Sequence, residues 1–198
     1  MTLELAILGV LAGGELHGYE VKKRIQELPG GILRASFGSL YPALGRLEDR
    51  ELVKAAEPEA RPRVNVPLSG SLSGEAAIFR SRRTKAPRSG RRKKVYAISD
   101  TGRDHLEELL VADITDDRAF PLQVAFCAHL PAATRRKLFE RRRNHIAERL
   151  AQRSSPTDID FYQQALLERH GDSLATDLAW LDRLIEHEQH PDPTGGKK

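Results

Sequence analysis

The side chains with the clearest chemical potential form a cationic run at residues 80–94. This run, RSRRTKAPRSGRRKK, holds nine basic side chains and no acidic one. Its basic members are Arg80, Arg82, Arg83, Lys85, Arg88, Arg91, Arg92, Lys93 and Lys94. Such a density of positive charge favours a polyanionic partner, above all nucleic acid. A solvated tether without a specific partner is the alternative, and the lack of an apolar face argues against a membrane surface.

Positive charge is concentrated in the first half of the chain. Residues 1–99 carry 18 Lys and Arg against 10 Asp and Glu, whereas residues 100–198 carry 14 against 18, within a formal net charge of +4. The 198 residues are 39% hydrophobic and 30% charged, which is enough apolar material for a packed core. One or two domains are expected at this length. No apolar stretch approaches the roughly 20 residues of a transmembrane helix, so we expect no membrane span.

Catalytic signals in the sequence are weak. Gly171–Leu174 spells GDSL, but it falls within a predicted helix near the C-terminus rather than on a loop after a strand. His187 and His190 lack the i, i+4 spacing of a zinc-binding helix. Cys127, the single cysteine, has apolar neighbours that favour a structural thiol over a nucleophile. We therefore expect no enzyme, no metal site and no cofactor, and a hydrolase on a helical scaffold is a remote alternative.

Three short amphipathic helices are predicted before residue 50. Thr2 caps the first, Gly13–Gly14 ends it, and Pro29–Gly31 ends the second. The third begins near Ser36–Ser39, with Pro42 in its early turns. The apolar side chains that recur at helical spacing are Leu3, Ala6, Ile7, Val10 and Leu11, then Val21, Ile25 and Leu28, then Phe37, Leu40, Leu44 and Leu47.

Two strand signals follow the helices, at residues 52–55 and 93–98. Between them, residues 57–91 are rich in Pro, Gly and Ser, which predicts a long hairpin tip. Three helices and then a hairpin are the order of a winged helix-turn-helix, whose third helix enters the major groove of DNA while the hairpin, or wing, lies along the backbone or minor groove. The predicted fold class is mainly α (α+β), with residues 1–99 as a DNA-binding domain whose long basic wing covers about 57–92.

The second half of the chain is predicted to be helical. Ser99–Gly102 starts one helix, a charged helix covers about 132–153, and Ser155–Asp158 caps a last helix that runs to about His190. Two apolar faces stand out, one formed by Leu106, Leu109, Leu110 and Ile114, and the other, a narrow coiled-coil-like seam, by Leu174, Leu178, Leu181 and Ile185. We expect residues 100–190 to form a helical dimerisation domain and residues 191–198 a disordered tail.

The outer face of the third helix has the small and polar side chains that a DNA groove requires. They are Ser36, Gly38, Ser39, Tyr41, Ala43 and Arg46. The hydroxyls suit phosphates or base edges, and Arg46 suits a guanine edge or a phosphate. An ordinary amphipathic helix with a polar face is the alternative, and the basic wing favours the DNA-binding interpretation.

Three segments resemble the PadR family of transcriptional regulators, namely LELAILGVLAGGELHGYEVKKRI, FGSLYPALGRLEDRELV and KKVYAISDTGRDHL. Leu40–Leu44 followed by Arg46–Glu48 is the most specific part, and His17–Glu20 adds to it. FPLQVAFCAHLPAATRRKLFERR and the terminal helix resemble, more loosely, the C-terminal domain of the long PadR subfamily. The chain departs from the family in two places: Glu51 stands where Gly is common, and the wing is longer than the usual hairpin.

The resemblance implies a dimeric DNA-binding repressor whose C-terminal helices form the dimer and often hold an effector site. The predicted DNA-binding residues are Ser36, Gly38, Ser39, Tyr41, Pro42 and Arg46 on the third helix, Tyr19, Lys22 and Lys23 on the second, and Arg82, Arg83, Arg91, Arg92, Lys93 and Lys94 on the wing. The predicted dimerisation residues are Leu106, Leu109, Leu110, Leu174, Leu178, Leu181 and Ile185, and closure of an intramolecular core is their alternative role. Candidate effector-pocket residues, which core packing also explains, are Phe120, Phe126, Phe139, Phe161, Tyr162 and Trp180.

These observations predict a sequence-specific transcriptional regulator. We expect a cytoplasmic homodimer on a palindromic operator in double-stranded DNA, acting as a repressor that a small hydrophobic effector releases. The alternative is an architectural DNA-binding protein of low sequence specificity that has no ligand and binds mainly through the basic wing.

Overall fold

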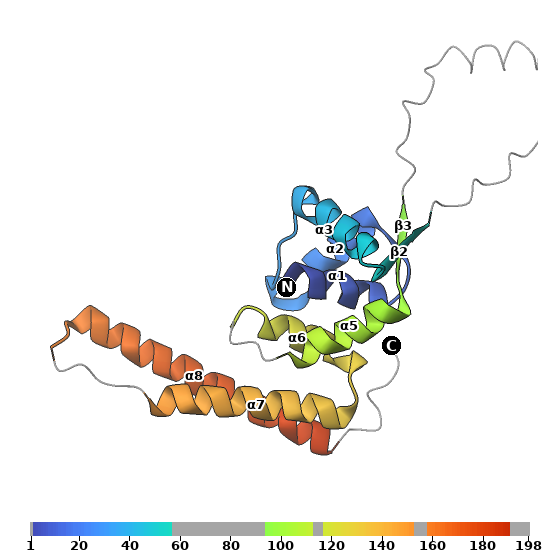
Figure 1. The fold of residues 1–198 in the computed structure, drawn as a ribbon. Helices are drawn as coiled ribbons and strands as arrows, with labels where there is room; N and C mark the ends of the chain where they lie inside the picture. Colours follow the sequence, from blue (N-terminus) through green and yellow to red (C-terminus); the bar gives the residue numbers. More distant parts are fainter. Residues whose placement is uncertain (1, 57–93, 113–116, 153–157, 191–198) are drawn as a thin grey trace, which may run out of the picture. The chain divides into compact units, whose positions relative to one another are not determined.

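The computed structural model describes residues 2–56, 94–112, 117–152 and 158–190 (Figure 1). The chain divides into two compact units, Met1–Leu106 and Glu107–Lys198. The predicted wing at about 57–92 and the predicted C-terminal tail lie outside the described residues.

The first unit combines helices with a small sheet. Its elements include α1 (Thr2–Ala12), β1 (Leu16–His17), α2 (Gly18–Gln26), η1 (Pro29–Gly31), α3 (Phe37–Asp49), β2 (Val53–Ala56) and β3 (Val95–Ile98). β3 is the middle strand of an antiparallel sheet and pairs with β2 on one side and β1 on the other. The predicted winged helix-turn-helix order is confirmed. β1 was not predicted, because two residues are too few to show an alternating pattern.

Each of the three helices buries one face in the core of this unit. The side chains that are almost entirely inaccessible include Ile7, Leu8 and Leu11 of α1, Val21 and Ile25 of α2, and Leu40 and Leu44 of α3. On α3, Ala43 is only 6% exposed, whereas Phe37 is 40% exposed. The prediction that Phe37 faces the core and Ala43 the groove is therefore wrong. Ala43 follows Leu40 by three residues and belongs to the same buried stripe, while Phe37, at the first position of the helix, stacks on surface rings.

A hydrogen-bonded turn ends α3. The N–H of Leu52 donates to the carbonyl of Leu47, and the N–H of Glu51 donates to the carbonyl of Glu48, both at 2.9 Å. This is the Schellman pattern, whose left-handed position usually holds Gly. Glu51 takes that position with a φ of 58°. The helix therefore ends where the resemblance places a glycine, at the cost of a strained backbone.

The next helix, α5 (Asp100–Val111), begins directly against this turn. The Ser99 hydroxyl donates to the Glu51 carbonyl at 2.7 Å and accepts the N–H of Gly102 at 3.0 Å, which caps α5 as predicted. A Cβ on Gly102 would lie 2.0 Å from the carbonyl oxygen of Leu52. Only glycine permits this approach, so Gly102 fixes the distance between α5 and the end of α3.

The second unit is built from α6 (Phe120–Phe126), η2 (Cys127–His129), α7 (Ala132–Ala151) and α8 (Phe161–Gln189). α7 and α8 pack against each other in antiparallel directions, and the N-terminal end of α8 extends beyond the C-terminal end of α7 (Figure 1). The buried core comprises Phe120, Leu138, Phe139, Ile146, Leu174 and Leu181. Leu178 and Ile185 of the predicted seam are partly buried against it.

α8 begins later than the sequence suggested. Asp160 caps the helix, because its carboxylate accepts the N–H of Gln163 at 2.8 Å and the Gln163 side chain accepts the N–H of Asp160 at 3.3 Å. The predicted cap at Ser155–Asp158 is wrong, since the residues from 158 to 160 are not helical. Two capping signals compete in this stretch, and the reciprocal Asp160–Gln163 pair is the stronger one.

One buried polar side chain closes the end of α5. The amide nitrogen of Gln123, on α6, donates to the carbonyl oxygens of Leu110 at 2.9 Å and Ala112 at 3.1 Å. Gln123 is only 2% exposed. It satisfies helix-end carbonyls that would otherwise be buried without a donor, a role that no pattern in the sequence indicated.

Candidate nucleic-acid interface

The exposed N-terminal end of α3 is held by a reciprocal cap. The N–H of Ser39 donates to the hydroxyl oxygen of Ser36, and the N–H of Ser36 donates to the hydroxyl oxygen of Ser39, both at 3.2 Å. The Ser39 hydroxyl also donates to the Ser36 carbonyl at 3.0 Å. Both hydroxyls, predicted as DNA contacts, are thus engaged in fixing the helix start. The backbone N–H groups of Phe37 and Gly38, in the first turn, have no carbonyl partner within the helix and suit a phosphate.

Three aromatic rings lie on the surface beside this helix end. Tyr19 of α2 stacks on Phe37 with ring centroids 6.3 Å apart, and Phe37 stacks on Tyr41 at 5.9 Å. Their exposures are 64%, 40% and 48% respectively, and we refer to the three as the aromatic cluster. Large exposed rings that contact one another mark a binding surface more often than a stability device. The sequence placed Tyr19 and Tyr41 in the interface but missed Phe37.

Lys22 and Gly18 shape the aromatic cluster. The ammonium nitrogen of Lys22 lies 4.0 Å from the centre of the Phe37 ring, in cation–π geometry. A Cβ on Gly18 would lie 2.9 Å from a ring carbon of Tyr41, so glycine lets that ring approach α2. Lys23, by contrast, is exposed and pairs with Glu27 at 3.7 Å on its own helix. Lys22 therefore packs on the aromatic cluster, whereas Lys23 adds exposed positive charge on the same helix.

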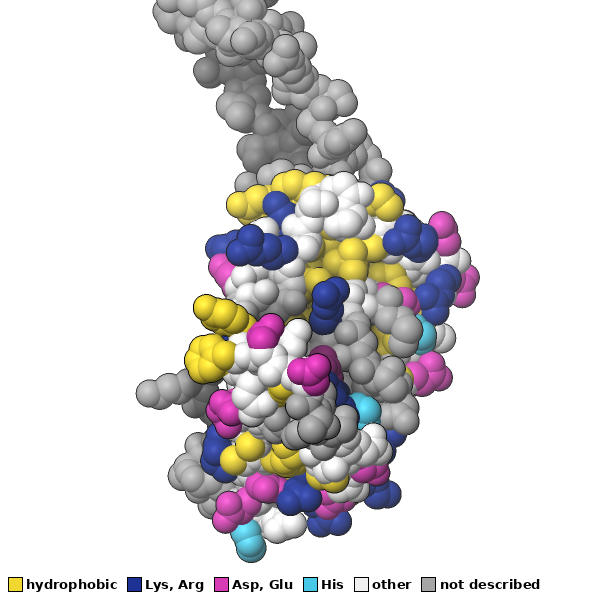
Figure 2. Space-filling model, turned by 90° about the vertical axis from the view of Figure 1, so that its left-hand side faces the viewer, with side chains coloured by type: hydrophobic (Ala, Val, Ile, Leu, Met, Phe, Trp, Pro, Cys, Tyr) yellow, Lys and Arg dark blue, Asp and Glu magenta, His cyan; other side chains and the backbone are white. Residues whose placement is uncertain are grey.

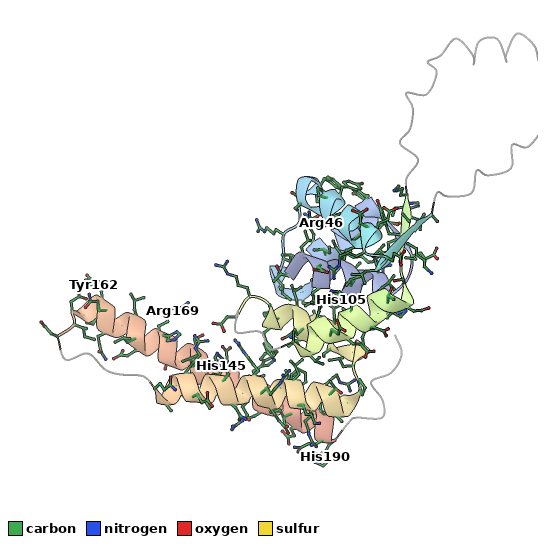
Figure 3. All side chains as sticks on the ribbon, viewed as in Figure 1. Arg46, His105, His145, Tyr162, Arg169 and His190 are labelled. Carbon is green, nitrogen blue, oxygen red and sulfur yellow. The ribbon has the colours of Figure 1, made fainter. Side chains whose placement is uncertain are left out.

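The remaining α3 residues differ in their surroundings. Arg46, labelled in Figure 3, is exposed on α3. Pro42 is also exposed and is the sixth residue of the helix, in its second turn, as the sequence predicted. Because proline has no N–H, the carbonyl of Gly38 lacks its usual helical donor. Ala43, as noted above, is buried and is removed from the predicted groove face.

Lys94 is the wing cation whose place the structure describes. Its ammonium nitrogen pairs with both carboxylate oxygens of Glu48 at 3.2 Å, which fixes the base of β3 against α3. Arg82, Arg83, Arg91, Arg92 and Lys93 lie outside the described residues. On the face shown in Figure 2, Lys and Arg side chains are interspersed with Asp and Glu side chains.

The predicted dimerisation residues are placed mostly inside single units. In the second unit, Leu174 is 4% and Leu181 0% exposed, and both contribute to the core formed by α6, α7 and α8. Leu106, Leu109 and Leu110 are likewise buried. Their burial is explained within one chain, so a dimer contact through these residues stays a prediction.

The candidate effector-pocket aromatics separate into two groups. Phe120 and Trp180 meet edge to face at 6.2 Å between ring centroids and line a cavity of about 310 Å³ in the second unit. Phe161 and Tyr162 are 79% and 77% exposed at the start of α8, where Figure 3 labels Tyr162, and they do not line that cavity. Phe126 and Phe139 are buried.

The described residues offer neither a metal-binding cluster nor a membrane-spanning helix. No group of three or more His, Cys, Asp or Glu side chains there could hold a metal ion, and no described helix is long and apolar enough to span a membrane. Cys127 is half-buried. Burial raises the pKa of its thiol, which makes it a poorer nucleophile.

Known relatives match both units. Residues 7–66 match the model of the transcriptional regulator PadR-like family, and residues 118–187 match that of the virulence activator alpha C-terminal domain. The transcriptional regulator YqjI of Escherichia coli is 39% identical over 57 residues, which are 29% of this chain and 28% of that protein. An uncharacterised 37.1 kDa protein in transposon TN4556 of Streptomyces fradiae is 36% identical over 88 residues, 44% of this chain and 24% of that protein. The matched part is therefore about a quarter of the length of these relatives.

Solved structures with a related chain include two of Bacillus subtilis PadR. One, in complex with operator DNA, is 21% identical with a TM-score of 0.39, over 95% of this chain and 99% of that chain. The other, in complex with p-coumaric acid, is 20% identical with a TM-score of 0.37, over 96% of this chain and all of that chain. The two family models cover the first unit from α1 to β2 and the second from α6 to nearly the end of α8. The chain thus belongs to the PadR-like family of transcriptional regulators, and its second half carries a virulence activator alpha C-terminal domain.

Proposed function

We propose that this protein is a sequence-specific, dimeric repressor that reads operator DNA with α3 and that a small effector releases. The observation that carries the proposal is the aromatic cluster, because it stands exposed beside the capped N-terminal end of α3. A helix start held by the Ser36–Ser39 pair presents backbone N–H groups in a fixed direction, as a phosphate contact requires. Arg46, further along the helix, supplies the group best suited to a guanine edge.

The basic wing supplies affinity rather than sequence choice in this proposal. Each phosphate that a cation neutralises contributes a slope of about −0.9 to the logarithm of the binding constant against the logarithm of salt concentration. If half of the nine cations in 80–94 engage DNA, the wing contributes about −4 per subunit. Arginines that enter a narrow minor groove would also read its width.

Dimerisation is proposed because one winged helix reads too short a site for selective binding in a genome. A twofold dimer doubles the readout and matches a palindromic operator. The exposed apolar start of α8 supports a second copy as partner, since Phe161, Tyr162 and Leu166 are between 68% and 79% exposed there. A regulator of this kind acts on chromosomal DNA, so we place it in the cytoplasm.

Selection of bound sequences from random DNA, followed by footprinting, tests the proposal. We expect a palindrome whose half-sites are centred about 10 base pairs, or a multiple of this, apart. Arg46→Ala should relax base preference at one position per half-site, whereas Arg103→Ala, an exposed arginine on α5, should leave the preference unchanged. Uniform protection without a selected motif would contradict the proposal and favour a low-specificity architectural protein.

A variant with an uncharged wing tests whether the wing contributes affinity for DNA without contributing sequence specificity. Replacing residues 80–92 with a Gly/Ser segment of equal length removes seven of the nine cations and keeps the hairpin length. The salt slope of operator binding should become shallower by about 3 per subunit, while the selected motif stays the same. The measurement is operator affinity at several salt concentrations, and an unchanged slope would contradict a DNA-bound wing.

A further inference from the structure

Phe37 stands at the start of α3, yet its side chain has no nitrogen or oxygen atom. It is the first residue of the helix, directly after the cap residue Ser36. In helix-turn-helix proteins, base contacts come from the N-terminal residues of the helix that enters the groove. The Phe37 ring is 40% exposed there, although phenylalanine usually belongs to a core. Only an apolar partner gains by contacting the exposed surface of this ring.

The Phe37 ring is held in place before any partner binds. Tyr19 and Tyr41 stack on it with ring centroids 6.3 Å and 5.9 Å away. Gly18 lets the Tyr41 ring approach α2, since a Cβ at this glycine would lie 2.9 Å from the ring. A ring that is already ordered loses little conformational entropy on binding. The Lys22 ammonium lies 4.0 Å over the Phe37 ring and covers one of its faces, which argues against insertion between base pairs.

The charges beside the aromatic cluster suit DNA. Lys22 places a cation directly at the Phe37 ring. α3 carries no acidic side chain before Glu48, and that carboxylate pairs with Lys94 at 3.2 Å. On α2, the Glu20 carboxylate accepts the N–H of His17 at 2.9 Å in the cap of the helix. A phosphate backbone would therefore meet a cation beside the rings, and both nearby carboxylates have partners within the protein.

The bases present one apolar group in the major groove, the methyl group at C5 of a pyrimidine. Thymine always carries this group, and cytosine carries it when it is methylated. We propose that Phe37 reads one such 5-methyl group in each operator half-site, with its ring held by the aromatic cluster. Phe37 is then a specificity-determining residue that adds an apolar contact to the hydrogen bonds of Arg46. The inference rests on the proposed function only in placing the first turn of α3 in the major groove.

Deoxyuridine provides the test, because it lacks only the methyl group of thymidine. The full-length protein is titrated with the palindromic operator obtained by selection, and fluorescence anisotropy of labelled DNA measures binding. Each thymine is replaced by uracil in turn, at the equivalent positions of both half-sites. We expect one position at which the replacement lowers affinity about fourfold per half-site, because burial of one methyl group stabilises by about 0.8 kcal/mol. The same replacement at the other thymines should change affinity by less than about twofold.

Methylated cytosine distinguishes the two sources of the methyl group. Each cytosine of a half-site is replaced in turn by 5-methylcytosine, which adds the methyl group and leaves the base pair unchanged. A loss of affinity with uracil assigns the contact to thymine. A gain of about fourfold per half-site on methylation assigns it to 5-methylcytosine, and binding would then respond to DNA methylation. No effect of either change at any position would overturn the proposal.

Variants of Phe37 connect the methyl group to the ring. Phe37→Ser removes the ring, so the affinity difference between methylated and unmethylated operators should disappear. Phe161→Ser is the matched control, because Phe161 is also an exposed phenylalanine, 79% accessible, but belongs to the second unit. It should keep the full difference. Retention of the full difference in Phe37→Ser would overturn the role of this ring.

A second variant covers the case in which Phe37→Ser does not fold. Phe37→Leu keeps an apolar but smaller side chain, and we expect it to fold and to reduce the effect of the methyl group to about twofold per half-site. Circular dichroism checks the fold of each variant. If Phe37→Leu keeps the full effect, the aromatic ring is not the group that reads the methyl group.

Failure of this inference and failure of the proposed function give different results. A selected motif in which no methyl group matters refutes the methyl contact and leaves the repressor standing. If selection returns no motif, the sequence-specific repressor is refuted, and binding is compared on random duplexes synthesised with thymidine or with deoxyuridine. Tighter binding to the thymidine duplexes that Phe37→Ser abolishes would still support the methyl contact. Equal binding to the two kinds of duplex would overturn it.

Discussion

α3 and α8 bury leucines at similar spacings, yet they use their other faces in opposite ways. α3 buries Leu40, Leu44 and Leu47 and presents Arg46 and two rings of the aromatic cluster to solvent. α8 buries Leu174 and Leu181 in the core that it shares with α6 and α7, and both side chains also line the cavity beside Trp180. A buried leucine stripe therefore identifies the core side of a helix but does not say whether its functional surface is outside or inside. The rings and charges beside the stripe decide that point.

The largest loss of stability is expected at the close approach between α5 and the turn that ends α3. Gly102→Ala would push a Cβ to 2.0 Å from the Leu52 carbonyl oxygen, so the backbone must shift. We expect a loss of about 4 kcal/mol in the free energy of unfolding, measured by urea denaturation, together with weaker operator binding. Gly45→Ala is the control, because no atom lies within 4 Å of its added Cβ. That change should stabilise α3 by up to about 1 kcal/mol, and a similar loss in both variants would refute the close-packing explanation.

The leucine seam of the second unit provides the next test. Leu181 is fully buried within one chain, and Leu181→Ala should cost about 3 kcal/mol of unfolding free energy. Because the contact is intramolecular, the cost should be the same at protein concentrations that differ by about a hundredfold. Chemical denaturation at both concentrations checks this. A cost that grows with concentration would show that the seam serves the dimer, and would remove the contrast with α3.

A smaller effect concerns the end of α3. Glu51 holds a φ of 58°, which glycine adopts without strain, and its side chain is exposed. Glu51→Gly should raise the free energy of unfolding by about 1 kcal/mol, as measured by thermal denaturation. Glu51→Ala removes the same charge but keeps the Cβ, so it isolates the backbone contribution. If alanine stabilises as much as glycine, the charge and not the strained backbone is responsible.

The smallest effect is a dependence on pH in the second unit. Burial alone would raise the pKa of the Asp117 carboxyl, but hydrogen bonds from Arg142 and Arg149 lower it in the folded protein. The stability that this carboxylate contributes is therefore present above about pH 4 and is lost as the pH falls through the folded value. Since the side chain is 54% exposed, we expect a contribution of only about 0.5 kcal/mol. Unfolding of the original protein and of Asp117→Asn between pH 6 and pH 2 measures it. The difference between the two should shrink in acid, and a constant difference would argue against the paired carboxylate.

The sequence was sufficient for features that repeat along the chain. The leucine periodicity of α3 and α8 and the strand signals predicted the helix-turn-helix and the helical second unit, because burial leaves a regular pattern. The sequence did not predict side-chain positions that depend on a single contact between residues far apart in the chain. Phe37 leaves the α3 core stripe because rings on two helices stack, and Gln123 turns inward because α5 ends beside it. Arg142 and Asp117 are 25 positions apart, and no local pattern indicated their pairing.

The single cysteine, Cys127, allows local opening of the second unit to be followed by the rate of thiol labelling. Cys127 is half-buried and, because burial raises its pKa, its thiol stays protonated at neutral pH, so a thiol reagent attacks it slowly while α6 and α7 remain packed. Each opening that exposes the sulfur speeds the reaction, and the first unit contains no residue that would react in its place. The rate of labelling therefore reports how often the second unit opens locally, without any substitution and without a competing thiol in the first unit.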